Sequence, residues 1–118
     1  MPLVCISYHP HRFIPWDELI PALVQLTAKE LSCCDPGGKL EIIDIATWTR
    51  EHDVPVERHQ AEIEIIIDAT TFPSRLANLD ERRANIVNGL RLILERHSFY
   101  VWVRLLPGSF ELVPAQKE

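Results

Sequence analysis

Short runs of β-forming residues alternate with longer runs of helical periodicity along the chain. The first run, Leu3 to Tyr8 (LVCISY), is short and rich in residues that favour strands, so it predicts a strand. The segment 16–33 predicts an amphipathic helix with Asp17 near its start as the capping residue. The apolar positions that recur at helical spacing are Leu19, Ile20, Leu23, Val24, Leu26 and Leu31. Residues 35–38 (DPGG) end this helix, and Lys39 to Trp48 is the second predicted strand.

The second half of the chain repeats this order. Ala61 to Asp68 alternates apolar and acidic positions, which predicts a strand with one covered face. Asn78 and Glu81 stand at capping-box spacing and predict the start of a second helix. Its apolar stripe is Leu79, Ile86, Val87, Leu90, Ile93 and Leu94. Gly89 is an internal weak point of this helix or a site of close packing. Phe99 to Leu106 is the last long strand, and residues 109–113 (SFELV) are expected to add a short edge strand.

These elements predict one α+β domain spanning residues 1–118. Two β-α-β halves, about 2–48 and 61–106, are joined by a polar linker at 49–60. A single four-stranded mixed sheet with both helices on one face buries the apolar stripes most economically. An alternative keeps the element order but gives the first strand antiparallel neighbours, as in a ferredoxin-like fold. The linker is long for a compact domain, and such loops often carry function.

Charge and composition narrow the classes of function. A net charge of −5 and a pI near 5.5, without a polybasic run, argue against nucleic-acid binding. We expect no membrane span and no signal peptide, because no apolar run approaches the roughly 18–20 residues that a span needs. Three cysteines, Cys5, Cys33 and Cys34, form a poor disulfide framework and indicate reduced thiols in the cytoplasm.

One face of the predicted sheet has an unusual composition. Alternation places Tyr100, Trp102 and Arg104 on one face of the last strand. It places Glu41, Ile43 and Ile45 on one face of the second strand. A face that mixes large aromatic residues with charges is typical of an oligomer interface. The alternative is a solvated face with scattered apolar residues.

The start of the chain carries the most specific signal. Pro2 heads the first predicted strand, Arg12 follows that strand, and the β-α-β unit is then repeated. This pattern resembles the tautomerase superfamily, which includes 4-oxalocrotonate tautomerase and macrophage migration inhibitory factor. The resemblance implies that Pro2 is the mature N-terminus, that Arg12 binds a substrate carboxylate, and that the chain assembles as a homotrimer without a cofactor.

Elementary chemistry supports these roles for Pro2 and Arg12. If Met1 is removed, Pro2 exposes a secondary amine, and α-amino groups have a pKa near ~7.7–8.0. Burial and a nearby cation both lower that pKa toward the value that a general base needs near neutral pH. The guanidinium of Arg12 matches a carboxylate bidentately. The pair suits keto-enol tautomerisation of a small 2-keto acid or aromatic enol.

The resemblance departs from the family at the second substrate-binding cation. Glu41 stands about where the short tautomerases carry a second arginine. Four arginines offer a replacement: Arg50, Arg58, Arg75 and Arg104. Arg75 is favoured, because it follows the third strand much as Arg12 follows the first. Tyr100, Trp102 and Arg104 are expected to supply pocket walls, from the same or a neighbouring subunit. A hydratase or dehalogenase variant would use a protonated Pro2 and one carboxylate among Glu57, Glu62, Glu64 and Glu111.

The sequence also supports other interpretations of the function and of the histidine and cysteine residues. The chain is alternatively a non-catalytic β-α-β homo-oligomer that binds a small ligand or a protein partner. His9 and His11 are a weak metal-ligand match, so no metal site is expected. His52 and His59 lie in the polar linker and are expected to be solvated. Cys33 and Cys34 have no local histidine base and are expected to be buried helix-end thiols.

Overall fold

The computed structural model describes residues 2–108, 111 and 113–116. Its strands are β1 (Leu3–Tyr8), β2 (Ala46–Glu51), β3 (Ile63–Thr70) and β4 (Phe99–Leu106). Its helices are α1 (Trp16–Leu31), the short α2 (Pro73–Ala77) and α3 (Leu79–Leu90), with a 3-10 turn, η1, at Ile42–Asp44. In the part of the chain that the structure describes, no helix is long and apolar enough to cross a membrane.

The four strands form one mixed sheet in the order β2-β1-β3-β4. β1 pairs with β2 in parallel and with β3 antiparallel, and β3 pairs with β4 in parallel. Each parallel pair is closed by a helical crossover, so the two β-α-β halves lie side by side. This is the predicted α+β fold. The parallel pairing of β1 with β2 differs from the ferredoxin-like alternative.

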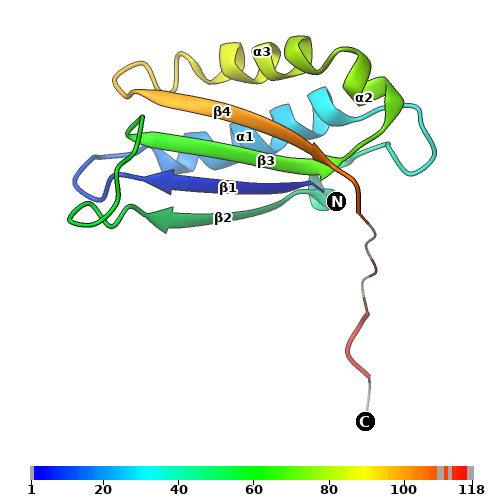
Figure 1. Ribbon diagram of the computed structural model, residues 1–118, viewed down its shortest axis with the longest axis horizontal. Helices are drawn as coiled ribbons and strands as arrows, with labels where there is room; N and C mark the ends of the chain where they lie inside the picture. The colour runs from blue at the N-terminus through cyan, green and yellow to red at the C-terminus, as the bar shows by residue number, and fades with distance from the viewer. Residues whose placement is uncertain (1, 109–110, 112, 117–118) are drawn as a thin grey trace.

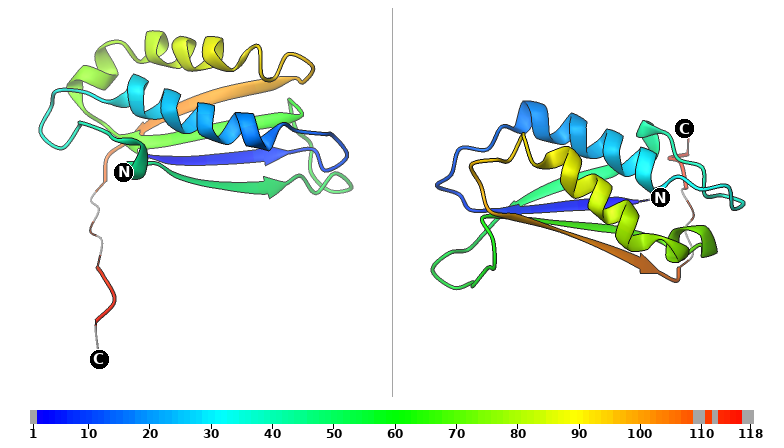
Figure 2. Two further views of the ribbon diagram at one scale, coloured as in Figure 1. Left: turned by 180° about the vertical axis from the view of Figure 1, so that it is seen from behind. Right: turned by 90° about the horizontal axis from the view of Figure 1, so that it is seen from above.

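The helices α1 and α3 lie on one face of the sheet, and no helix of the described residues covers the other face (Figures 1 and 2). Alternate residues of each strand point under the helices, which explains the alternating burial of β1 and β3. The core contains Val4, Ile6, Ile14, Leu19, Leu23, Leu31, Ile63, Ile65, Ile67, Ala69, Ile86, Leu90, Leu94, Val101 and Val103. The apolar stripes predicted for the two helices contribute Leu19, Leu23, Leu31, Ile86, Leu90 and Leu94 to this core, and the strands supply most of the rest.

The predicted second strand is shifted. It was expected at 39–48, but β2 occupies Ala46–Glu51 and therefore includes the first residues of the predicted linker. The turn η1 precedes it because Glu41 and Asp44 cap each other, and the Glu41 N–H donates to the Asp44 Oδ2 at 2.8 Å. Glu41, Ile43 and Ile45 consequently do not share a strand face. β3 also begins and ends two residues later than predicted.

Both predicted helix caps are wrong in detail. Pro15, not Asp17, occupies the N-cap of α1, and Asp17 lies in the first turn, where its charge suits the helix dipole. Asn78 holds the N-cap position of α3, but its Oδ1 accepts from Arg82 Nε at 2.6 Å rather than from the helix backbone. The helix α2 was not predicted. The expected edge strand at 109–113 lies largely outside the described residues.

Candidate functional site

Pro2 lies at the end of the sheet where β1 and β2 begin. It is buried, and its carbonyl oxygen accepts a hydrogen bond from the Ala46 N–H at 3.2 Å. Because β3 runs antiparallel to β1, the C-terminal ends of β3 and β4 lie at the same end of the sheet as Pro2. Thr70 and Leu106, the last residues of these two strands, pair with each other there.

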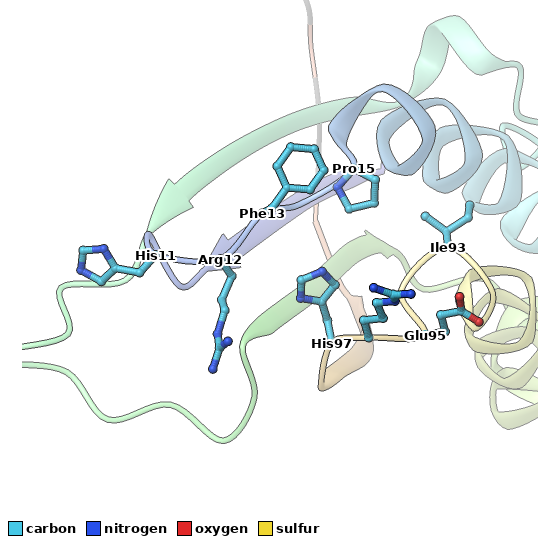
Figure 3. A pocket seen from close by; sticks show the side chains of 8 residues that line it. His11, Arg12, Phe13, Pro15, Ile93, Glu95 and His97 are labelled. Atoms are coloured by element: carbon cyan, nitrogen blue, oxygen red, sulfur yellow. The ribbon is translucent and has the colours of Figure 1, made fainter.

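Arg12 lies beyond the opposite end of β1. A six-residue strand spans about 20 Å, so Pro2 and Arg12 of one chain cannot contact the same small substrate. Arg12 is exposed, and its Nε lies 3.6 Å from a Glu62 carboxylate oxygen. It borders a hollow of about 470 Å³ between the loop after β1 and the loop before β4 (Figure 3). The hollow is lined by His11, Arg12, Phe13, Pro15, Ile93, Glu95, Arg96 and His97.

Arg75 lies at the Pro2 end of the sheet, but its guanidinium is already engaged. The residue is only 2% exposed. Its Nε donates to the Leu31 carbonyl at 2.6 Å, and its two Nη atoms donate to the carbonyls of Thr70 and Gly38 at 2.9 and 3.3 Å. Burial lowers the pKa of this guanidinium from its usual value. Arg75 therefore ties α1, β3 and the loop before η1 together.

Tyr100, Trp102 and Arg104 all lie on the open face of the sheet, as predicted by the alternation of β4. The strand register places them at the ends of three rows that cross all four strands. The rows are Arg50, Ser7, Glu64 and Tyr100; Trp48, Cys5, Ile66 and Trp102; and Ala46, Leu3, Asp68 and Arg104. The middle row is apolar, and its two tryptophans are each about half exposed.

Arg104 is held on this face by its neighbour in the row. Its Nε and Nη2 donate to the two carboxylate oxygens of Asp68 at 2.6 and 2.7 Å, and its guanidinium lies 5.0 Å from the Trp102 ring centroid. The bidentate pair raises the pKa of Arg104. Of the arginines that the sequence suggested for substrate, Arg75 and Arg104 are thus held by short contacts and Arg12 by a longer ion pair.

A buried polar network at the other end of the open face was not predicted. The imidazoles of His52 and His59 are stacked, with ring centroids 3.5 Å apart and planes within 2° of parallel. His59 Nδ1 lies 2.6 Å from Glu64 Oε1, and its Nε2 lies 3.2 Å from Glu57 Oε1. The second Glu64 oxygen accepts from the Gln60 N–H at 3.1 Å. These nitrogen and oxygen atoms are of the kinds that hold divalent metals.

The charges of this network are set by their contacts. Hydrogen bonding to Arg50, above all, lowers the pKa of Glu57 to about 2, and the backbone N–H of Asp53 adds to this effect. The hydrogen bond to Glu64 raises the pKa of His59, whereas burial lowers the pKa of His52. Burial and Glu64 together raise the pKa of Tyr100.

The expectation that His52 and His59 are solvated is wrong. His52 is 4% exposed and the His59 side chain 16%. The His52 N–H continues the β1–β2 ladder by donating to the Tyr8 carbonyl at 2.7 Å, and His59 returns to contact Glu64 of β3. The signal that pointed here was the length of the linker, together with the alternation that places Glu64 on the open face. A hollow of about 540 Å³ opens beside His59, Glu64, Tyr100 and Trp102.

Solved structures with this fold were found by structural comparison. A fused 4-OT wild-type asymmetric trimer superposes with a TM-score of 0.65 at 12% identity, over 97% of this chain and 94% of that one. A 5-carboxymethyl-2-hydroxymuconate delta-isomerase gives 0.63 at 11% identity, over 100% and 89%. A macrophage migration inhibitory factor-like protein from Entamoeba histolytica gives 0.57 at 13% identity, over 91% and 90%.

No family model matches the sequence, and no curated protein matches it in a sequence search. At these low identities the structural likeness establishes the fold alone. The chain has the fold of the tautomerases and of macrophage migration inhibitory factor-like proteins, as the resemblance at its N-terminus implied. Activity has to be argued from the residues.

Proposed function

We propose that the chain is a tautomerase that moves a proton beside the carbonyl of a small 2-keto acid or aromatic enol. The observation that carries this proposal is the place of Pro2, buried at the head of β1 in a chain with the tautomerase fold. The mechanism requires Pro2 to be the first residue of the mature chain, because only then is its nitrogen a free secondary amine. Burial then lowers the pKa of that amine and favours the neutral base.

The carboxylate of the substrate would be bound by an arginine of another copy of the chain. Pro2 and Arg12 lie at opposite ends of β1, so a site that uses both has to be built between subunits. The open sheet face is the surface on which such copies would meet, and Tyr100, Trp102 and Arg104 would then line the interface and its pockets. The fused 4-OT structures are trimers, and we propose a homotrimer here.

Arg75 has a narrower part in the proposal. It is the predicted cation at the Pro2 end, but it is only 2% exposed and three of its five N–H groups donate to backbone carbonyls. Its guanidinium has to become accessible before it can bind a substrate carboxylate. We further propose a reducing compartment, the cytoplasm, because Cys5, Cys33 and Cys34 are free thiols. No cofactor is needed for proton transfer by an amine base.

The test is a spectrophotometric ketonisation assay on untagged protein whose intact mass shows that Met1 is absent. The substrates are the enol of phenylpyruvate and 2-hydroxymuconate. We expect Pro2→Ala to lower kcat/KM by at least about 10²-fold, the range of general-base catalysis. Arg12→Ala should raise KM for the dicarboxylate. Wild-type protein that is inactive on both substrates, or Pro2→Ala as active as wild type, would refute the proposal.

The alternative function is a non-catalytic homo-oligomer that binds a small ligand or a protein partner. It is favoured by the engagement of Arg12 with Glu62, of Arg104 with Asp68 and of Arg75 with backbone carbonyls. Retention of Met1 on the native protein would exclude the amine mechanism and leave this alternative standing. The two functions share the fold and the open face. They differ in whether the nitrogen of Pro2 is a free amine.

A further inference from the structure

The network of the linker gathers three residues whose side chains are metal ligands in other proteins. His52 and His59 come from the linker and Glu64 from β3. One nitrogen or carboxylate oxygen of each lies within 4.8 Å of the corresponding atoms of the other two. Two of the residues are buried and the third is partly buried. Such a concentration of nitrogen and carboxylate ligands inside an acidic domain needs a physical reason.

His52 supplies an independent observation. Its Nε2 is buried and, within the described part of the chain, has no hydrogen-bond partner. The residue is only 4% exposed, so water does not readily satisfy this atom. A buried imidazole nitrogen without a partner costs free energy, unless it binds something that is absent from the protein alone.

His59 and Glu64 are oriented as ligands of a metal usually are. A ligating histidine generally donates its other ring N–H to a carboxylate, and that carboxylate is itself held by further contacts. His59 Nδ1 faces Glu64, while its Nε2 faces Glu57 at 3.2 Å. Glu57 is in turn fixed by Arg50 Nη2 at 2.8 Å and by the Asp53 N–H at 2.9 Å. Glu57 is therefore already in place to support the His59 Nε2 when Nδ1 binds a metal.

We propose that His52, His59 and Glu64 bind one divalent transition metal of the zinc class. Two histidines and one glutamate form a known type of zinc ligand set that leaves a fourth position open. The metal would take the place of the proton between His59 Nδ1 and Glu64 Oε1, and that proton would be released to solvent. The proposal does not depend on the tautomerase activity.

The site requires a small local rearrangement on binding. Ligand atoms about 2.0–2.1 Å from a tetrahedral zinc are about 3.3 Å apart, so the three residues have to close in. The lone pairs of two parallel stacked imidazoles lie in separate planes, so the His52 ring also has to rotate out of the stack. The hollow bordered by His52, Glu57 and His59, of about 300 Å³, gives room for this rotation and for entry of the ion.

The consequence would be a linker fixed to the sheet. The metal would join residues 52 and 59 of the linker to β3 beside the hollow that Tyr100 and Trp102 line on the open face. Metal occupancy would therefore stabilise the part of the open face that lies closest to the linker, and binding to the folded state alone raises the apparent stability.

The first experiment titrates Zn²⁺ into untagged, chelator-stripped protein by calorimetry, with Co²⁺ absorption as a spectroscopic probe. We expect one metal per chain with a dissociation constant in the micromolar range or tighter, a cobalt spectrum without thiolate charge-transfer bands, and a higher melting temperature with Zn²⁺. His59→Gln and Glu64→Gln should each abolish this binding. Glu57→Gln should weaken it by about 10–100-fold, because it removes only the outer shell.

Two control variants exclude the other ligands of the chain. His9→Gln/His11→Gln removes the exposed histidine pair, and Cys33→Ser/Cys34→Ser removes the adjacent thiols; both should bind metal as wild type does. Binding lost in either control, or kept in folded His59→Gln and Glu64→Gln, would overturn the proposal. If these two variants do not fold, Glu57→Gln and the cobalt spectrum decide. Wild type that binds no Zn²⁺ also overturns it.

Discussion

Pro2 and Arg12 lie at opposite ends of the same strand. Pro2 precedes β1 at the end of the sheet where β2 also begins. Arg12 lies in the loop that leaves the far end of β1, next to Glu62. The strand between them is fully hydrogen-bonded on both sides, to β2 and to β3. It cannot fold back to bring the two residues together. Any activity that needs both residues therefore has to draw them from two different chains.

This separation predicts complementation between two inactive variants. Pro2→Ala and Arg12→Ala should each be inactive or strongly impaired on a dicarboxylate enol when assayed alone. After the two are unfolded together and refolded as mixed oligomers, some sites combine an intact Pro2 with an intact Arg12 from another copy. Ketonisation activity should then return to well above the sum of the two separate preparations.

The matched control mixes Pro2→Ala with the double variant Pro2→Ala/Arg12→Ala. No site in that mixture contains a free proline base, so its activity should stay at the background level. If Pro2→Ala and Arg12→Ala mixtures remain as inactive as this control, although mass measurements show mixed oligomers, the two residues do not share a site between subunits.

A second prediction concerns Arg75, which we expect to contribute chiefly to stability. Its guanidinium donates to the carbonyls of Leu31, Thr70 and Gly38, and the residue is only 2% exposed. Arg75→Leu removes the guanidinium donors of the Leu31 and Thr70 carbonyls, whereas the Gly38 carbonyl keeps its hydrogen bond from the Cys33 N–H at 2.9 Å. It should lower the free energy of unfolding by about 3 kcal/mol, as measured by urea denaturation.

The comparison variant is Arg58→Leu, at an exposed position of the linker. Exposed substitutions usually change the stability by less than about 0.5 kcal/mol, so its urea midpoint should match that of wild type. Should Arg75→Leu be equally stable but have a raised KM, Arg75 would instead be a substrate-binding residue that leaves its carbonyl partners when the ligand arrives.

Periodicity predicted the order of the strands and of the two long helices, but it left the strand arrangement open to a ferredoxin-like alternative. β1 and β4 have the predicted bounds, because each is an uninterrupted run of β-forming residues with turn residues beside it. The second strand was misplaced because Ile42 and Ile43 look like strand residues, whereas the mutual capping of Glu41 and Asp44 turns the backbone there. Local hydrogen bonding thus overrode β-propensity.

The candidate sites were harder to predict than the fold. That Tyr100 and Trp102 share a face follows from a period of two, which sequence alone gives. The hydrogen bonds of Arg75 to three carbonyls cannot be predicted in this way, because its partners come from segments up to 44 positions away. The stacking of His52 on His59 depends likewise on how the linker returns to β3, and no local pattern encodes that path.

A third prediction concerns the open face of the sheet. Trp48 and Trp102 occupy the two ends of its apolar row and are 51% and 53% exposed. We expect Trp48→Glu/Trp102→Glu to place charges in a subunit interface and to dissociate the oligomer into folded monomers. Sedimentation velocity should show the loss of the larger species, with an unchanged far-ultraviolet circular dichroism spectrum.

An exposed leucine away from this face provides the control for this prediction. Leu92 is 79% exposed and lies in the connection between α3 and β4, outside the strands of the sheet. Leu92→Glu adds the same charge to an apolar position and should leave the sedimentation coefficient unchanged. A double tryptophan variant that sediments like wild type would show that the open face is not the interface between copies.

The last prediction tests the packing of the two helices at Gly89. A Cβ built on Gly89 would lie 2.7 Å from the two terminal carbons of Leu26, so α3 approaches α1 closely at this point, as the sequence indicated. Gly89→Leu should overpack this contact and destabilise the fold by about 1–3 kcal/mol. Leu26→Ala combined with Gly89→Leu should recover part of that loss, because the leucine then fills the space vacated on α1. Urea denaturation of the two single variants and the double variant measures the coupling. If the losses of the two single variants simply add in the double variant, the two side-chain positions do not share the same space.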